Sequence, residues 1–185
     1  MATRSTSMAA LRRRFKMAQR LYVIMGVAGS GKTSIGEGVA EQIDGTYIDG
    51  DDYHPQSNID KMANGEPLND NDRWPWLEII AGELARIEGV GLVGCSALKR
   101  IYRDFITKNV GEPVRFIYLD GSKDLIAERM AARTGHFMPT SLLDSQFEAL
   151  EVPDETENAV PIDISGTEQQ VIKLIVDEIS KNQGE

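Results

Sequence analysis

The residues with the clearest chemical meaning form one octapeptide, Gly26-Val27-Ala28-Gly29-Ser30-Gly31-Lys32-Thr33. It fills the pattern G-x-x-x-x-G-K-[ST], in which glycines let backbone N–H groups curl around phosphate oxygens. Lys32 is placed to reach the outer phosphates of a nucleotide, and Thr33 offers a hydroxyl to Mg²⁺. We therefore predict that residues 26–33 bind ATP and Mg²⁺ and that Lys32 is catalytic.

The flanks of this octapeptide have the pattern that a phosphate-binding loop requires. Residues 21–25 are a compact apolar run, typical of a buried strand. After the loop, Ile35, Val39 and Ile43 recur at helical spacing, which predicts a helix over residues 34–43. The N-terminus of that helix would bring the positive end of its dipole to the phosphates.

Strand-like and helix-like segments alternate along the rest of the chain. The predicted strands are residues 21–25, 46–49, 90–95, 114–119 and 159–164. This alternation predicts a three-layer α/β fold, in which a five-stranded parallel sheet carries helices on both faces. Ligands of such sheets bind at the carboxyl ends of the strands, so polar residues there are the candidates for the site.

Capping signals predict where several helices begin. Asp72 is a predicted N-cap, which would place Pro75 in the first turn of the following helix. Ser122 is predicted to cap the helix after the fourth strand, and Thr167 with Gln170 resembles a capping box for the last helix. The last helix also has apolar residues that we expect on one face: Val171, Leu174, Ile175 and Ile179.

Polar side chains that suit phosphoryl transfer follow the predicted strands. The set is Asp49, Asp51 and His54 after the second strand, Ser96, Lys99 and Arg103 after the third, and Arg129 and Arg133 on the helix after the fourth. Phosphoryl transfer needs cations around the moving group and an acceptor for the proton of the attacking hydroxyl. We predict that Arg129 and Arg133 supply the charge and that Asp51 takes the proton, which makes all three catalytic candidates.

The two histidines and the single cysteine also have simpler interpretations. His54 and His136 both lie in predicted loops, where histidines are commonly inert, and two histidines are too few for a convincing metal site. Cys95 is embedded in a predicted strand, which favours a core role over a nucleophilic one. We expect Trp74 and Trp76 to pack over the site.

Composition narrows the possible classes of protein. The 185 residues carry a formal net charge of −9, which argues against a large nucleic-acid surface. A single cysteine excludes a disulfide framework within one chain and fits a reducing compartment, so we expect a cytoplasmic location. No apolar run approaches transmembrane length, so we expect no membrane partner.

Residues 1–20 differ from the remainder of the chain because they carry six basic residues and no acidic one. We expect a flexible basic extension, and residues 21–185 to form a single domain. The alternatives are a start codon assigned too early, with Met8 and Met17 as later starts, or an organelle transit peptide.

Several stretches together resemble the gluconokinase family. The stretches are Asp49-Gly50-Asp51-Asp52-Tyr53-His54-Pro55, Asn58 with Lys61-Met62, Gly65-Glu66-Pro67-Leu68-Asn69-Asp70, Asp72-Arg73, Pro75-Trp76-Leu77, Cys95-Ser96-Ala97-Leu98-Lys99, Tyr102-Arg103-Asp104, Gly135-His136-Phe137 and Gln146-Phe147-Glu148. The resemblance covers roughly residues 21–180. The block from Asp49 to Leu77, together with residues 96–99, is much more specific than the phosphate loop.

The resemblance implies a P-loop NTPase fold similar to that of shikimate and nucleoside monophosphate kinases. It implies an acceptor-binding segment at about residues 50–76, a small lid at about residues 134–158, and a homodimer. The implied reaction is transfer of a phosphoryl group from ATP to D-gluconate. The candidates for binding gluconate are Asp51, His54, Arg73, Ser96, Lys99, Arg103 and His136.

The third strand ends in Cys95-Ser96, where many phosphate-loop enzymes have an Asp that helps to hold Mg²⁺. We therefore expect the metal to depend on Thr33 and ATP, with Asp49 acting through water. Two alternative functions stay open from the residues themselves. One is a kinase of the same fold with another acceptor, such as shikimate, and the other is a nucleotide-dependent switch without small-molecule chemistry.

Overall fold

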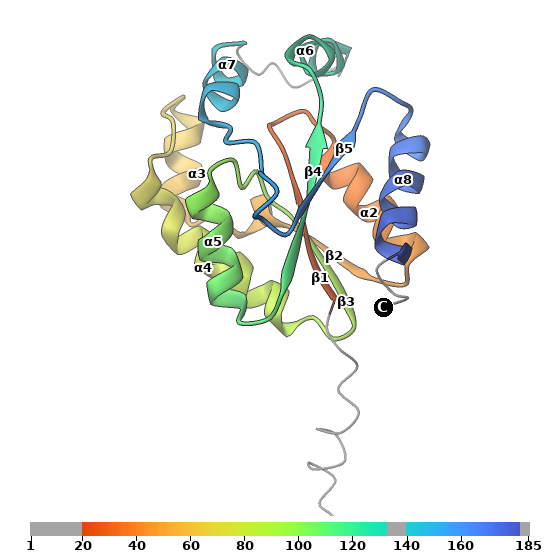
Figure 1. Ribbon diagram of the computed structural model, residues 1–185. Coiled ribbons are helices and arrows are strands. Elements are labelled where there is room, and N and C mark those ends of the chain that lie inside the picture. Colours follow the sequence, from red (N-terminus) through yellow and green to blue (C-terminus); the bar gives the residue numbers. More distant parts are fainter. Residues whose placement is uncertain (1–19, 133–139, 182–185) are drawn as a thin grey trace, which may run out of the picture.

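The structure is a computed structural model that describes residues 20–132 and 140–181. Within these residues, parallel strands form one sheet in the order β2-β3-β1-β4-β5 (Figure 1). The strands are β1 (Arg20–Met25), β2 (Thr46–Asp49), β3 (Val90–Gly94), β4 (Val114–Asp120) and β5 (Ala159–Asp163). The predicted α/β class and the five parallel strands are confirmed.

Helices cover both faces of the sheet, as Figure 1 shows. One face packs against α2 (Lys32–Gln42) and α8 (Glu168–Lys181), and the other against α4 (Asp70–Arg86) and α5 (Arg100–Val110). Strand β1 serves both cores, because successive side chains of a strand point to opposite faces. Tyr22 and Ile24 join the core beneath α2 and α8, and the alternate residues of β1 join the other.

The remaining elements lie near the carboxyl ends of the strands. A 3-10 turn, η1 (Gly50–Tyr53), and α3 (Gln56–Ala63) follow β2. The helices α6 (Lys123–Ala132) and α7 (Thr140–Ala149) lie beyond the carboxyl end of β4 (Figure 1). Residues 134–139 of the predicted lid lie outside the described residues.

The start of α4 differs from the prediction. The N-cap is Asn69, whose side-chain oxygen accepts a hydrogen bond from the Asp72 N–H at 3.1 Å. The Asp72 carboxylate accepts in return from the Asn69 N–H at 2.9 Å, so Asp72 is the third helical residue of a capping box. Because the helix begins earlier than predicted, Pro75 lies beyond its first turn.

The other two predicted caps are confirmed. The Leu125 N–H donates to Ser122 Oγ at 3.2 Å, and the Thr167 N–H donates to Gln170 Oε1 at 2.8 Å. The predicted apolar face of α8 is wrong at Leu174, which is 51% exposed. Ile172 is buried in its place, because the buried arc of the helix is centred between the directions of Ile175 and Ile179, so that Ile172 points into it and Leu174 away from it.

Two glycines make room for the ring of Tyr47 between β3 and α2. A Cβ added at Gly94 would lie 2.1 Å from the Tyr47 hydroxyl oxygen, and one added at Gly36 would lie 2.2 Å from Tyr47 Cε2. Real Cβ contacts are never that short, so a larger residue at either position would displace the ring. Tyr47 thereby fixes β2 against α2, and β2 ends at Asp49 in the candidate site.

Candidate active site

The phosphate loop joins β1 to α2 with the geometry that its glycines allow. Gly29 and Gly31 have φ angles of 82° and 94°, a region that glycine enters without steric cost. A Cβ at Gly29 would also lie 2.6 Å from Met130 Cγ of α6. The predicted loop is therefore a strand-to-helix turn with α6 packed against it.

Two polar side chains of the loop differ in how their polar atoms are paired. Lys32 Nζ donates to the carbonyl oxygens of Gly26 at 3.2 Å and Val27 at 3.1 Å, so its charge lies against the loop. Ser30 is fully buried, and in the described part of the chain its Oγ has no hydrogen-bond partner. An orphaned hydroxyl, a lysine and glycine backbone together fit a phosphate-bearing ligand.

Asp49 connects the phosphate loop to the residues after β2. Its Oδ2 accepts from Thr33 Oγ1 at 2.7 Å, and its Oδ1 accepts from the Asp51 N–H at 3.0 Å. The second bond caps η1 and fixes the backbone of Asp51. Hydroxyl and carboxylate oxygens are the donors that Mg²⁺ prefers, so Thr33 and Asp49 fit the metal role predicted for them.

Asp51 presents an exposed carboxylate beside a buried imidazole. Its side chain is 73% exposed, and its Oδ1 lies 3.9 Å from His54 Nε2. The His54 ring stacks on Trp76 with 4.2 Å between ring centroids, and Trp76 Nε1 donates to the Gly50 carbonyl at 2.7 Å. Burial lowers the pKa of His54 below its usual value, which favours the neutral ring at neutral pH.

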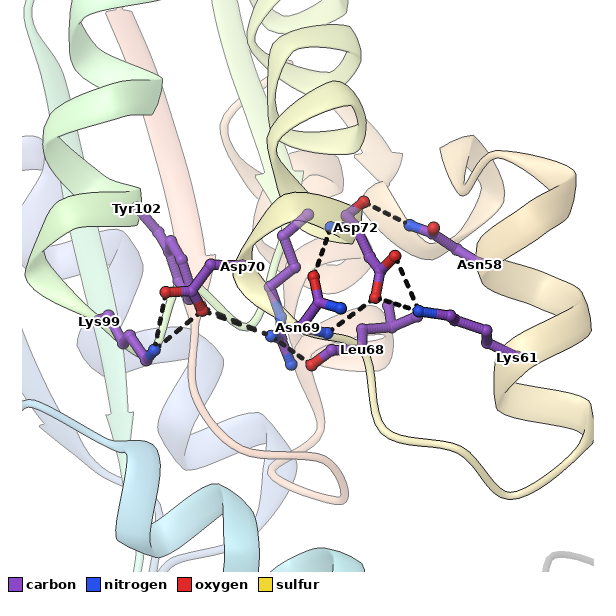
Figure 2. A network of polar contacts seen from close by, with 9 residues as sticks. Asn58, Lys61, Leu68, Asn69, Asp70, Asp72, Lys99 and Tyr102 are labelled. Atoms are coloured by element: carbon purple, nitrogen blue, oxygen red, sulfur yellow. Dashed lines mark hydrogen bonds and ion pairs between the residues drawn. The ribbon is translucent and has the colours of Figure 1, made fainter.

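The segment after η1 is tied to the start of α4 (Figure 2). Asn58 is buried, and its Nδ2 donates to the Asp72 carbonyl at 2.8 Å. Lys61 Nζ donates to both carboxylate oxygens of Asp72, at 2.8 and 3.0 Å. These bonds hold α3 against the N-terminal turn of α4, so the predicted acceptor-binding segment has a defined structure.

A second polar cluster lies where α4 and α5 begin (Figure 2). Asp70 Oδ1 accepts from the Tyr102 hydroxyl at 2.5 Å and from Lys99 Nζ at 2.9 Å. Arg73 Nη1 lies 3.9 Å from the same oxygen and donates to the Leu68 carbonyl at 2.6 Å. The structure thus brings together Arg73 and Lys99, two of the predicted substrate-binding residues.

Arg103 is a correction to the predicted substrate-binding set. Its side chain is 1% exposed and pairs with Glu157, with Nε to Oε2 at 2.5 Å. Its Nη1 also donates to the carbonyls of Ala97 and Leu98, both at 3.1 Å. A guanidinium used in this way fixes the loop after β3 and presents no donor to an acceptor molecule.

Arg129 of α6 contacts the loop between β5 and α8. Its Nη2 donates to the carbonyls of Ile164 and Gly166. In this structure it therefore holds that loop, and its proposed contact with the transferring phosphoryl group remains a prediction. Arg133 and His136 lie outside the described residues. Ser96 lies at the end of β3, where its carbonyl accepts from the Gly26 N–H at 3.3 Å.

Sequence reasoning did not assign a role to Gln146, Asp70 or Tyr102. Gln146 of α7 accepts through Oε1 from the Ala28 N–H of the phosphate loop at 2.6 Å, across 118 residues of chain. All three residues stand in the stretches that resemble gluconokinases, and that was the available signal. The spacing of these residues in the sequence gave no such signal, because each meets its partner only through tertiary contacts.

The predicted core role of Cys95 is confirmed. The residue is completely buried, and burial raises the pKa of its thiol to about 12, which suppresses the nucleophilic thiolate. Among residues 20–132 and 140–181, no group of three or more His, Cys, Asp and Glu residues could hold a metal ion. No helix in this part of the chain has the length and hydropathy to cross a membrane.

A parallel α/β sheet with a phosphate loop at its carboxyl edge, and a carboxylate beyond that loop, defines the class of phosphate-loop kinases. No protein-family model matches the chain. The chain is 50% identical to thermosensitive gluconokinase of Escherichia coli (strain K12) over 154 residues, 80% of this chain and 81% of that protein. It is 40% identical to gluconokinase of Gluconobacter oxydans (strain 621H), covering 77% and 82% of the two chains. The chain therefore belongs to the gluconokinase family.

Solved structures agree with this assignment. A gluconokinase from Sinorhizobium meliloti 1021 superposes with a TM-score of 0.81 at 42% identity, covering 89% of this chain and 95% of that one. A shikimate kinase from Acinetobacter baumannii superposes with a TM-score of 0.58 at 16% identity, covering 94% and 99%. The second likeness shows a common fold only.

Proposed function

We propose that this protein transfers the γ-phosphoryl group of ATP to D-gluconate and so forms 6-phospho-D-gluconate. The observation that carries the proposal is the joint placement of two sets of groups at one edge of the sheet. The phosphate loop and Asp51 supply the transfer chemistry, and Arg73 with Lys99 supplies cations for an anionic acceptor. Half of the aligned residues are identical to those of a named gluconokinase, which supports this acceptor.

The nucleotide end of the site depends on residues 26–33. Loop N–H groups and Lys32 bind the phosphates, and the N-terminus of α2 adds its dipole. Thr33 and, through water, Asp49 would hold Mg²⁺, which would supply positive charge against the negative charge that develops on the phosphates. A phosphate oxygen would compete with Gln146 for the Ala28 N–H, which couples nucleotide binding to the position of α7.

The acceptor end depends on Asp51. Its backbone is fixed by Asp49, and its carboxylate faces solvent where the terminal hydroxyl of gluconate would lie. Asp51 orients this hydroxyl and accepts its proton as the oxygen attacks the γ-phosphorus. His54 stays neutral beside it and serves as a hydrogen-bonding partner for gluconate hydroxyls. Arg129 and Arg133 are proposed to stabilise the moving phosphoryl group, with His136 contacting the acceptor.

An acceptor panel tests the proposal. Release of ADP from MgATP is measured with D-gluconate, with shikimate and without acceptor, and the product is identified by mass. We expect turnover with D-gluconate alone. Stimulation by shikimate but not by gluconate would replace the proposed acceptor. Hydrolysis of ATP that no sugar acid changes would favour a nucleotide-dependent switch.

We also propose a homodimer and a cytoplasmic location. The dimer rests on the family resemblance, and the location rests on the single cysteine, which fits a reducing compartment. Light scattering coupled to gel filtration would measure the mass against 20.4 kDa for one chain. A monomer at micromolar concentration would contradict the dimer.

A further inference from the structure

The cluster of Asp70, Lys99, Arg73 and Tyr102 combines opposite charges in a way that a simple anion site does not need. Two cations would be sufficient to attract a carboxylate. Here Lys99 Nζ and Arg73 Nη1 lie 2.9 and 3.9 Å from an oxygen of a third charged group, the Asp70 carboxylate, which belongs to the chain itself. Figure 2 shows the pair of Asp70 and Lys99. A carboxylate inside a cationic subsite can accept hydrogen bonds from a ligand, which neither Lys nor Arg can do.

The two oxygens of Asp70 are used unequally. Oδ1 accepts from both the Tyr102 hydroxyl at 2.5 Å and Lys99 Nζ at 2.9 Å, whereas the contact from Lys99 to Oδ2 is longer, 3.2 Å. The Asp70 side chain is 41% exposed, so a ligand can reach it. The hydrogen bond from Tyr102 and the charge of Lys99 lower the pKa of Asp70 and keep it an acceptor at neutral pH.

Lys99 can serve the ligand and Asp70 simultaneously. An ammonium group has three N–H donors, and its side chain is 31% exposed. Because one nitrogen contacts both oxygens of Asp70, a ligand carboxylate bound to Lys99 is separated from Asp70 only by that nitrogen, and a hydroxyl on the adjacent carbon can reach Asp70. A ligand that matches both groups has an anionic carboxylate and a hydroxyl donor on adjacent atoms.

Tyr102 is a buried residue whose hydroxyl donates a hydrogen bond to Asp70. It is 4% exposed, and its ring makes an edge contact with Trp74 at 5.4 Å between centroids. Lys99 Nζ and the Arg73 guanidinium carbon lie 5.5 and 5.7 Å from the centre of the same ring. Tyr102 therefore holds the carboxylate of Asp70 in place from within the fold and limits the movement of both cations.

We propose that this cluster binds the α-hydroxy acid end of the acceptor and that Asp70 determines its specificity for the hydroxyl group. Lys99, with Arg73, binds the acceptor carboxylate, Asp70 Oδ2 accepts from the hydroxyl on the adjacent carbon, and Tyr102 is a positioning residue for Asp70. The inference rests on the proposed function, since D-gluconate has such a hydroxyl at C2. It adds that the enzyme selects acids by this hydroxyl as well as by charge.

The test compares D-gluconate with 2-deoxy-D-gluconate, which keeps the carboxylate and the terminal hydroxyl. The wild-type enzyme is expected to prefer gluconate in kcat/KM by about tenfold or more, since a charged hydrogen-bond acceptor is left unpaired by the deoxy acid. In Asp70→Ala the activity with gluconate falls and the activity with the deoxy acid changes little, so the ratio approaches one. Tyr102→Phe lowers the ratio in the same direction, mainly through KM.

The control variant is Lys61→Ala, which removes the other ion pair at the start of α4. It is expected to change the two activities by the same factor and to leave their ratio as in the wild type. An Asp70→Ala enzyme that keeps the wild-type ratio, or that loses both activities equally, would overturn the proposal. So would a Tyr102→Phe enzyme with wild-type constants for both acids. A wild-type enzyme that phosphorylates neither acid would instead refute the proposed function.

Discussion

Asp51 combines a fixed backbone with an exposed carboxylate. The Asp49 cap immobilises its N–H, and the carboxylate itself is left to solvent and to His54. This division suits a proton acceptor, because the group is positioned by the main chain and stays available to the substrate. A strand-end carboxylate that only capped a turn would have its side chain engaged, as that of Asp49 is.

Asp51→Asn is expected to lower kcat by about 10²–10⁴-fold, because the amide keeps the shape but cannot accept the proton. The KM for ATP should change little, since the residue lies beyond the phosphate loop. Steady-state ADP release with D-gluconate measures both constants. Asp52→Asn, an exposed carboxylate in the same turn, is the control and should retain wild-type turnover. Full activity in Asp51→Asn would remove the residue from the mechanism.

His54 should make stability depend on pH. Burial lowers the pKa of His54 in the folded state below the usual value of about 6.5 that it has in the unfolded state. At a pH between the folded and the unfolded pKa, the unfolded state therefore binds more protons. The free energy of unfolding therefore falls as the pH is lowered through this window. The difference in unfolding free energy between wild type and His54→Gln, measured by urea denaturation, should change from about pH 7 to 5. A constant difference would contradict the shifted pKa.

The segment after α7 is hydrogen-bonded to the residues that precede α5. The Glu151 N–H donates to the Leu98 carbonyl at 2.9 Å, and the buried pair of Arg103 and Glu157 lies nearby. Because the segment from Glu151 to Glu157 falls within the predicted lid, this part of it is anchored to the core. Movement of a lid would therefore involve residues on the N-terminal side of this anchor.

Glu157→Ala is expected to destabilise the protein by about 3–5 kcal/mol, because it leaves the buried guanidinium of Arg103 without its counter-charge. Chemical denaturation followed by circular dichroism measures the loss. Lys173→Ala, which breaks an exposed ion pair with Asp177 on α8, is the matched control and should change stability little. Equal losses of stability in the two variants would show that the buried pair contributes no more to the free energy of unfolding than the exposed pair does.

The site lies at one edge of the sheet, where separate segments of the chain meet. The phosphate loop, η1, the starts of α4 and α5, and α7 each contribute a group, and the parallel sheet brings them to one side (Figure 1). The sheet begins at Arg20, whose N–H donates to the Gly89 carbonyl at 3.0 Å. The core and the site described above are built from Arg20 and the residues that follow it.

A chain that begins at residue 18 is therefore expected to keep the melting temperature of the full chain and its kcat/KM for D-gluconate. The physical reason is that β1 and the residues after it supply the core and the site. Thermal unfolding and the gluconate assay on both chains measure these quantities. A large loss of activity in the shorter chain would assign the basic segment a part in the reaction.

Local patterns in the sequence were sufficient for much of this molecule. Alternating strands and helices determined the parallel sheet, and capping chemistry located Ser122 and the Thr167–Gln170 box correctly. The phosphate loop followed from one octapeptide, because its function depends on backbone conformation and on residues adjacent in the chain. The same local reasoning placed the start of α4 three residues too late, since Asn69 and Asp72 are both good caps.

Only the tertiary structure decided which charges are available to a ligand. Arg103 and Lys99 follow the same strand and look equivalent in the sequence, yet one is buried against Glu157 and the other is partly exposed beside Asp70. Gln146 reaches the Ala28 N–H across a sequence separation of 118 residues, and no local spacing encodes that bond. The physical reason is that the burial and pairing of a long side chain are set by what folds against it, whereas loop and helix geometry are set largely by neighbours in the chain.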